Sequence, residues 1–146
     1  KEHRLLAPQA GAMGAGVPAA LAAKSIYPNR QVICFAGDGD FQMSASELGT
    51  AMQEGLNPII LIHNNGSYGT IRMHQEMRYP KRVSGTNLKN PNFKCIAEAY
   101  NFGYSKITNL SEFKVAFEKA KTFDVGFIIE MLADIKDISP GKIIDL

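Results

Sequence analysis

Short apolar runs that alternate with helical patterns are the feature that most limits how this chain of 146 residues can fold. Runs typical of buried strands lie at residues 31–36, 58–63 and 126–132, and a shorter extended stretch lies at residues 104–107. Helical patterns separate these runs, and strands that alternate with helices are typical of a parallel sheet covered by helices. We therefore predict a single α/β domain with a parallel sheet flanked by helices on both faces.

The first two predicted helices have start and stop signals in the sequence. The first helix covers about residues 13–25 and is rich in alanine. Ser44 and Glu47 fit a capping box at the start of the second helix, in which the serine side chain bonds a free N–H and the glutamate reaches back. Gly55 fits the C-terminal end of that helix.

The second half of the chain contains two further predicted helices. Residues 64–89 before them are polar and mixed, and so long a connection within a domain is usually functional or mobile. Asn90 and Pro91 are predicted to start the next helix, as cap and first turn. Ser111 is predicted to cap an amphipathic helix that runs through Lys121.

Polar residues and glycines follow two of the predicted strands at the points where the strands end. Residues 37–40 read Gly-Asp-Gly-Asp, and residues 64–69 read Asn-Asn-Gly-Ser-Tyr-Gly. Only one helix and one strand separate the two segments, so they belong to one βαβ unit. Because ligands of such sheets bind outside the carboxyl ends of the strands, we expect both segments at one ligand-binding edge.

The residue types in these segments suit a divalent cation and a diphosphate. Asp38 offers a carboxylate and Asn65 an amide oxygen, an incomplete ligand set that Mg²⁺ completes with phosphate oxygens and water. Backbone N–H groups around Gly39 and Asp40 suit a diphosphate. Each segment alone is more often a plain turn, and their joint placement is what favours a site. No Gly-x-Gly-x-x-Gly follows a strand, so the dinucleotide fingerprint is absent.

These residues resemble a known family. Residues 37–39, followed after 24 residues by Asn64 and Asn65, resemble the thiamine-diphosphate signature of acetolactate synthases and 2-oxo acid decarboxylases. Residues 11–20 are similar to the family's segment around the aminopyrimidine ring, and residues 78–80 and 83–86 look like its acetolactate-synthase-like branch. The resemblance covers nearly the whole chain and implies a thiamine-diphosphate-binding fold.

The resemblance also implies a role for each matching residue. Mg²⁺ would be bound by the side chains of Asp38 and Asn65 and by the main-chain carbonyl of Ser67. Thiamine diphosphate would be contacted by Gly11, Met13, Gly37, Gly39, Asp40, Tyr68, Gly69 and Thr70. The Gly11 carbonyl and the Met13 amide would face the pyrimidine ring, and the Met13 side chain would support the bent cofactor. Asp40 stands where many relatives carry serine, and its orientation is left open.

The family's catalytic glutamate lies on a separate pyrimidine-binding domain. We therefore expect residues 1–146 to be the diphosphate-binding domain of a longer enzyme, without a catalytic residue of its own and inactive alone. The expected partner is a pyrimidine-binding domain of the same or another chain, within a homodimer or homotetramer. The whole enzyme would be a transferase or lyase that decarboxylates a small 2-oxo acid and ligates the product, as acetolactate synthases do. Two alternatives stay open: an isolated, non-catalytic fragment, or part of a simple decarboxylase of benzoylformate or sulfopyruvate type.

Composition and single residues complete the predictions. A net charge of +2 with scattered Lys and Arg gives no reason to expect nucleic acid, and no apolar stretch approaches the roughly 20 residues of a membrane span. The two cysteines, Cys34 and Cys95, are unclustered and interpreted as core residues, which suits a reducing compartment and the cytoplasm. His63 is interpreted as completing a buried strand, and Tyr79 and Tyr100 as packing residues.

Overall fold

A computed structural model describes residues 4–139 and 142–143, so both ends of the predicted domain 1–146 lie outside the described residues. The main sheet has four strands in the order β1-β2-β4-β3, and all its pairings are parallel. The strands are β1 (Ile33–Gly37), β2 (Ile59–Asn64), β3 (Gly103–Ile107) and β4 (Phe127–Leu132). The predicted parallel α/β sheet is confirmed.

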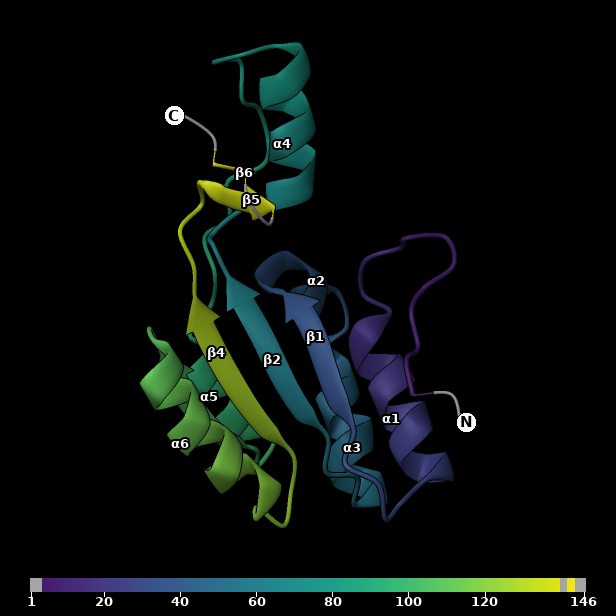
Figure 1. Cartoon of the computed structure of the whole chain (residues 1–146). Coiled ribbons are helices and arrows are strands. Elements are labelled where there is room, and N and C mark those ends of the chain that lie inside the picture. Colours follow the sequence, from purple (N-terminus) through teal and green to yellow (C-terminus); the bar gives the residue numbers. More distant parts are fainter. Residues whose placement is uncertain (1–3, 140–141, 144–146) are drawn as a thin grey trace.

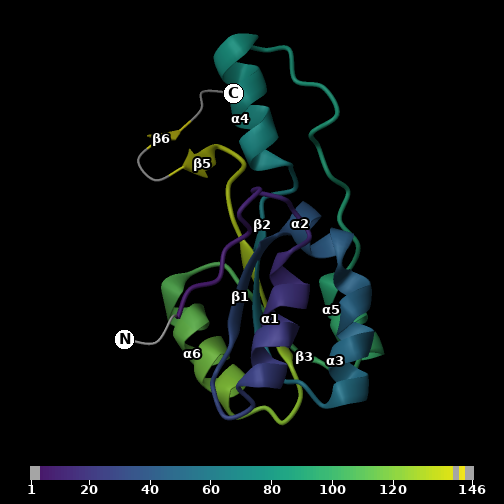
Figure 2. The same ribbon diagram turned by 90° about the vertical axis from the view of Figure 1, so that its right-hand side faces the viewer.

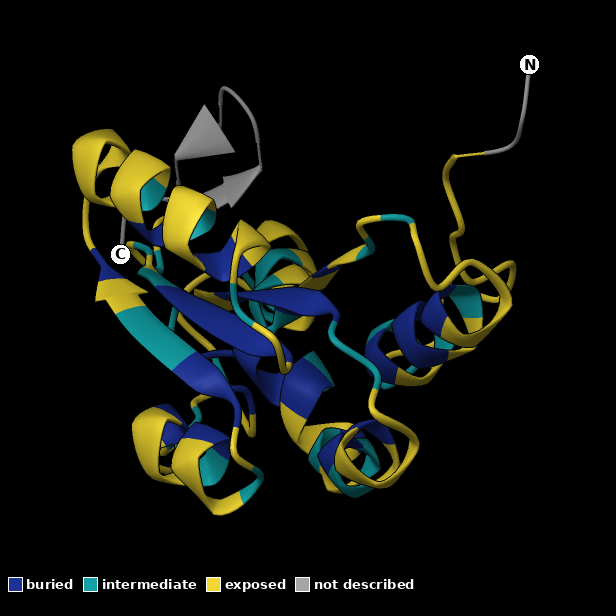
Figure 3. Ribbon diagram, turned by 90° about the horizontal axis from the view of Figure 1, so that it is seen from below, coloured by how far each residue is buried: buried dark blue, intermediate teal, exposed yellow. Residues whose placement is uncertain are grey.

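Helices cover both faces of this sheet (Figures 1 and 2). They are α1 (Gly16–Ile26), α2 (Asp38–Met43), α3 (Leu48–Glu54), α5 (Phe93–Ala99) and α6 (Leu110–Lys121), with a 3-10 turn η1 (Ala45–Glu47) before α3. One core joins α1, α2, α3 and α5 to one face of the sheet, and a second core joins α6 to the other. In Figure 3 the buried central strands lie between helices whose outer sides are exposed.

The central strands β2 and β4 contribute to both cores, which explains the apolar runs Ile59–Ile62 in β2 and Phe127–Ile129 in β4. In β2, Ile60 and Ile62 enter the first core, whereas Ile59 and Leu61 enter the second. A strand that is covered on both faces carries apolar residues at every position. None of the helices that the structure describes has the length and apolar character of a membrane span.

A helix that the sequence did not reveal occupies part of the connection at residues 64–89. This helix, α4 (Gly69–Arg78), projects from the carboxyl edge of the sheet, near β5 (Asp137–Ser139) and β6 (Lys142–Ile143), as Figure 1 shows. The interpretation of residues 64–89 as one polar connection was therefore incomplete. None of the residues of α4 is buried, so the helix lacks the buried stripe by which a helix is recognised in a sequence.

The predicted capping box at Ser44 is wrong. The Ser44 hydroxyl is buried without a hydrogen-bond partner among the described residues, and Glu47 instead accepts from Thr50 Oγ1 at 2.9 Å. The reason is that residues 45–47 form the 3-10 turn η1 rather than the first turn of α3. The predicted end of α3 is confirmed, because Gly55 adopts a left-handed conformation with φ of 62°.

Two other caps fall on neighbouring asparagines. Asn92, and not Asn90, caps α5, and its Oδ1 accepts from the N–H groups of Lys94 and Cys95 at 3.0 and 3.3 Å. Asn109, and not Ser111, caps α6, and its Oδ1 accepts from Glu112 N at 3.0 Å. Both asparagines have the extended backbone that a capping residue needs.

Of the single residues predicted to be buried or packed, some lie in or against the core and others are exposed. Cys34 is buried and Tyr100 packs against the first core, as predicted. The core position predicted for Cys95 is wrong: Cys95 is exposed because it lies on the solvent side of α5, whereas Phe93 and Ala97 of that helix face the core. Tyr79 is exposed just after α4 ends, and His63 is exposed where β2 leaves the cover of the helices, so the packing roles predicted for these two were wrong.

Candidate functional site

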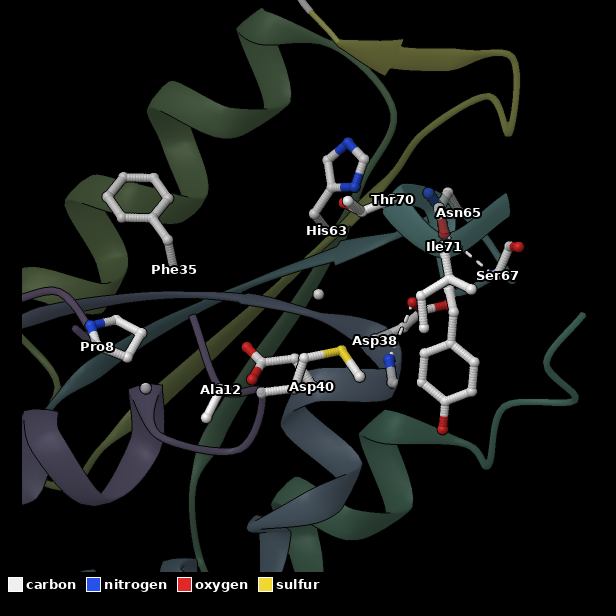
Figure 4. Close-up of a pocket in the computed structure, with 16 residues that line it drawn as sticks. Pro8, Ala12, Phe35, Asp38, Asp40, His63, Asn65, Ser67, Thr70 and Ile71 are labelled. Carbon is white, nitrogen blue, oxygen red and sulfur yellow. Dashed lines mark hydrogen bonds between the residues drawn. The ribbon is translucent and has the colours of Figure 1, made fainter. Parts of the chain in front are cut away.

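The carboxyl ends of β1 and β2 lie side by side and form one edge of a cleft. The two strands pair in parallel with Gly37 opposite His63, so the segments that follow them start at the same level. Residues 37–40, which include the start of α2, form the first loop of the cleft, and residues 64–69 form the second. The cleft has a volume of about 400 Å³. In the view of Figure 4, Asp38 lies between the N-terminal segment with Ala12 and the second loop with Asn65 and Ser67.

Most of the predicted site residues line this cleft. Ten of the eleven do so: Met13, Gly37, Asp38, Gly39, Asp40, Asn65, Ser67, Tyr68, Gly69 and Thr70. Gly11 is not among the lining residues and lies in an exposed turn, where its N–H donates to the Pro8 carbonyl at 3.3 Å. The two loops therefore lie at the same edge of the sheet, as expected.

Asp38 is buried at the base of the cleft and is bonded to the second loop. Its Oδ2 accepts from Gly66 N at 2.8 Å and from Asn90 Nδ2 at 2.6 Å. Its Oδ1 accepts from Gly39 N at 3.0 Å. A carboxylate oxygen has two lone-pair sites, so Oδ2 is saturated by these donors and Oδ1 keeps one site for a further partner.

The second loop is held in a tight turn that exposes oxygen atoms. Asn65 Oδ1 accepts from Ser67 N at 3.0 Å, and the Ser67 carbonyl accepts from Gly69 N at 2.9 Å. Each of these oxygens keeps a second lone-pair site. Gly69 permits the turn, because a Cβ at this position would lie 2.8 Å from Asn65 Nδ2.

Residues 86–88 are hydrogen-bonded to the second loop and hold it in place. Ser67 is buried, and its hydroxyl donates to the Thr86 carbonyl at 2.8 Å. The same carbonyl accepts from Tyr68 N at 2.9 Å, and Leu88 N donates to the Gly66 carbonyl at 2.8 Å. The loop is therefore positioned by the fold itself.

Asp40 connects the first loop to the N-terminal segment. Its Oδ1 accepts a hydrogen bond from the N–H of Gly14, a residue whose φ is 83°. Burial first and the charge of Asp40 second raise the pKa of the Cys34 thiol to about 11. The orientation that the sequence left open is thus toward Gly14, although the residue also lines the cleft.

The chemistry of these donors fits a hard cation that is shared with a ligand. Across residues 4–139 and 142–143, no three His, Cys, Asp or Glu side chains gather as a metal site of their own. One carboxylate oxygen, one amide oxygen and one carbonyl oxygen remain available at the cleft. Mg²⁺ accepts such a partial set, since it usually keeps waters and takes further oxygens from phosphates.

Some residues of the site were missed in the sequence. Asn90 was interpreted as a helix cap, yet its amide bonds Asp38. His63, Phe35 and Ile71 also line the cleft. No local signal identifies Asn90, because it lies 52 positions from its partner. The position of His63 at the end of a strand beside the motif could have identified it.

A family model and curated relatives that match this chain belong to the same class of enzymes. The family model described as the thiamine pyrophosphate enzyme, C-terminal TPP binding domain, matches residues 1–131. The acetolactate synthase large subunit of Buchnera aphidicola subsp. Schlechtendalia chinensis is 37% identical over 140 residues, which are 92% of this chain and 24% of that protein. The acetolactate synthase large subunit of Lactococcus lactis subsp. lactis is 42% identical over 100 residues, which are 68% of this chain and 17% of that protein.

A solved structure matches the fold. The thiamine diphosphate-dependent 4-hydroxybenzoylformate decarboxylase of Rhodococcus jostii RHA1 superposes with a TM-score of 0.80 at 30% identity. The match covers 86% of this chain and 24% of that one. The chain thus spans no more than about a quarter of the length of these relatives.

Proposed function

Because the chain belongs to the thiamine pyrophosphate enzymes, as a C-terminal TPP-binding domain of acetolactate synthase-like type, we propose that it binds thiamine diphosphate through one Mg²⁺ ion at the cleft between β1 and β2. The observation that carries this proposal is the placement of Asp38. Its buried carboxylate is hydrogen-bonded to the loop that contains Asn65 and keeps one oxygen site open.

Different residues of the cleft would bind the metal ion, the diphosphate and the pyrimidine ring. Asp38 Oδ1, Asn65 Oδ1 and the Ser67 carbonyl would hold the metal ion. Gly37, Gly39, Asp40, Tyr68, Gly69 and Thr70 would surround the diphosphate. Gly11 and Met13 would meet the pyrimidine ring, with the Met13 side chain, which is 44% exposed in this chain, against the cofactor.

The protein's own contribution is binding and orientation. When bound, thiamine diphosphate supplies the nucleophilic carbon and the electron sink that decarboxylation of a 2-oxo acid needs. The loops around Asp38 and Asn65 hold the phosphate end of such a ligand at a fixed edge of the sheet. We assign no catalytic residue to the described part of this chain.

We propose that the substrate class is small 2-oxo acids, with decarboxylation followed by carboligation. The relatives named as acetolactate synthases favour this reaction. A simple decarboxylase is the second candidate, favoured by the structural match to a 4-hydroxybenzoylformate decarboxylase. Product analysis with pyruvate separates the two, because a ligase releases a five-carbon hydroxy-oxo acid and a decarboxylase releases an aldehyde.

We further propose that a pyrimidine-binding domain, on the same or a partner chain, completes the site within a homodimer or homotetramer. The short span of the chain relative to its relatives, which are named as large subunits, supports the second domain in this proposal. The free cysteines, Cys34 and Cys95, support a reducing compartment such as the cytoplasm. The alternative is a fragment that binds the cofactor without taking part in any reaction. It predicts that no pyrimidine-binding domain associates with this chain.

Two experiments test the proposal. Thiamine diphosphate and Mg²⁺ together should raise the melting temperature of the chain, because a ligand that binds only the folded state stabilises it, whereas either component alone should have little effect. The chain alone, mixed with thiamine diphosphate, Mg²⁺ and pyruvate, should release no CO₂ above background. Equal stabilisation without Mg²⁺ would contradict the metal site, and CO₂ release would contradict the need for a second domain.

A further inference from the structure

A buried carboxylate lies in the middle of the sheet, away from the cleft. Glu130 of β4 is 4% exposed and is opposite Lys106 of β3 and Ile62 of β2. It accepts from Asn64 Nδ2 at 2.7 Å and from the Tyr104 hydroxyl, and Lys106 Nζ is 3.5 Å away. A buried carboxylate is costly unless it is hydrogen-bonded, so its presence among apolar strands requires a reason.

Glu130 determines how the Asn64 amide is oriented. A carboxylate only accepts hydrogen bonds, so Asn64 must present Nδ2 to it. The Asn64 Oδ1 therefore faces the opposite way, where it accepts from Gly66 N at 3.2 Å and from Asn90 Nδ2 at 2.8 Å. Burial, together with the hydrogen bond to Glu130 and its charge, raises the pKa of Tyr104, so the phenol stays protonated and donates to the other carboxylate oxygen of Glu130.

Asn90 transmits this orientation to Asp38. Its Nδ2 is committed to Asn64 Oδ1 and donates at the same time to Asp38 Oδ2 at 2.6 Å. Its Oδ1 accepts from Gln42 Nε2 at 2.9 Å, which fixes the amide from the other side. The direction of the Asn64 Nδ2 is thus set by Glu130, and the direction of the Asn90 Nδ2 is set in part by Asn64.

From this series we infer that Glu130 is a positioning residue for the metal-binding carboxylate, acting through Asn64 and Asn90. The inference rests on the proposed function, because it assigns Asp38 Oδ1 as the metal-binding atom. With Oδ2 saturated by Asn90 and Gly66, Oδ1 is the oxygen of this cleft-lining carboxylate that keeps an open lone pair. Loss of Glu130 would free Asn64 to rotate, and Asn90 would then lose the Asn64 oxygen that helps to hold its Nδ2 on Asp38 Oδ2.

The simpler explanation is that Glu130 only stabilises the sheet through its other partners. Lys106 is 51% exposed, and ion pairs of such exposed groups contribute little. A purely stabilising Glu130 would affect the free energy of unfolding but not the two asparagine amides or the metal. The two explanations therefore differ in what a metal probe would report.

The test compares three variants of the full chain. Glu130→Met keeps the side-chain volume and removes the acceptors, Glu130→Gln keeps one acceptor for Asn64, and Lys106→Met removes only the exposed cation. Side-chain amide signals of Asn64 and Asn90 are followed by NMR without metal or cofactor, and Mn²⁺ affinity is measured by electron paramagnetic resonance with thiamine diphosphate present. Unfolding curves identify any variant that does not fold.

We expect Glu130→Met to shift both amide signals and to weaken Mn²⁺ binding by about tenfold to a hundredfold, the range typical of groups that orient metal ligands. Glu130→Gln should restore most of the affinity, and Lys106→Met should match the wild type. In an Asn90→Ala background, Glu130→Met should cause no further loss, because the path to Asp38 is already broken.

Unshifted amide signals in Glu130→Met would overturn the inference without reference to any cofactor. Shifted signals with unchanged Mn²⁺ affinity, or an additive loss in the double variant, would overturn it as well. Failure of the wild-type chain to bind Mn²⁺ with thiamine diphosphate is a different result, which would refute the proposed function and with it the metal-binding part of this inference.

Discussion

Adding one methyl group at Gly39 should destabilise the chain by displacing a tyrosine ring of the cleft. A Cβ at this position would lie 2.4 Å from Tyr68 Cε1, 2.9 Å from Tyr68 Cδ1 and 3.0 Å from Leu88 Cδ1. Tyr68 directly precedes α4 and its N–H donates to the Thr86 carbonyl at 2.9 Å, so either the ring must turn away or the second loop must shift. Gly39→Ala therefore tests whether the two loops are packed against each other.

The size of the effect follows from two opposing terms. Alanine is favoured over glycine in a helix by up to about 1 kcal/mol, and overpacking of this kind costs about 1–3 kcal/mol. We expect Gly39→Ala to lower the free energy of unfolding by about 1 kcal/mol net, the difference between these terms. We also expect weaker binding of thiamine diphosphate, because Tyr68 lines the cleft.

Gly49→Ala is the matched control. Gly39 and Gly49 are each the second residue of their helix, but a Cβ at Gly49 would meet Tyr100 Cε1 at 3.5 Å, an ordinary contact. Gly49→Ala should therefore stabilise the chain by up to about 1 kcal/mol. Urea unfolding measures both changes, and truncation by Tyr68→Ala should remove most of the cost of Gly39→Ala, leaving the contact with Leu88 Cδ1. The reasoning is refuted if Gly39→Ala stabilises the chain as much as Gly49→Ala does.

Three further predictions concern thiols, helix caps and acid stability. Since the pKa of Cys34 is raised to about 11 while Cys95 is exposed, a thiol reagent at about pH 8 should modify one cysteine in the native chain and both after unfolding; two rapid reactions in the native chain would contradict the burial of Cys34. Asn109→Ala should cost about 1 kcal/mol in urea unfolding and Ser111→Ala almost nothing, because Asn109 is the cap of α6; the reverse order would contradict the assigned cap. Hydrogen bonds from the backbone and hydroxyl of Thr108 lower the pKa of Glu112 below its usual 4.5, so its stabilising effect is present above that pH and is lost as the pH falls through the lower folded value. Glu112→Gln should remove this part of the acid dependence of unfolding, and an unchanged dependence would be evidence against the Thr108 contacts.

The fold could be predicted because its central strands are buried on both faces. Ile59 to Ile62 alternate between two cores, and this produces the continuous apolar runs that indicate a parallel sheet. The helix α4 could not be predicted, because it buries none of its residues. Caps were misassigned by two positions where Asn90 and Asn92, or Asn109 and Ser111, compete as capping residues, since only the backbone conformation decides between them.

The cleft itself could be predicted to a large extent, for a topological reason. Two strands joined by a single helical crossover bring their carboxyl ends together, so Asp38 and Asn65 reach one cleft. The residues behind the cleft could not be predicted. Asn90 and Glu130 contact the motif residues from 52 and 66 positions away, and no sequence period connects them.

Calorimetric titration of the chain with thiamine diphosphate, in Mg²⁺ and in a chelator, is the most direct test of the proposed site. The matched variant is Asn65→Ala, because among residues 4–139 and 142–143 the Asn65 side chain makes only one hydrogen bond, to Ser67 N, whereas Asp38 bonds to both loops. We predict binding by the wild type only with Mg²⁺, and a loss of most of that binding in Asn65→Ala with unfolding unchanged to within about 1 kcal/mol. Binding that is equally strong in the chelator, or equally strong in Asn65→Ala, would contradict a metal ion held between the two loops.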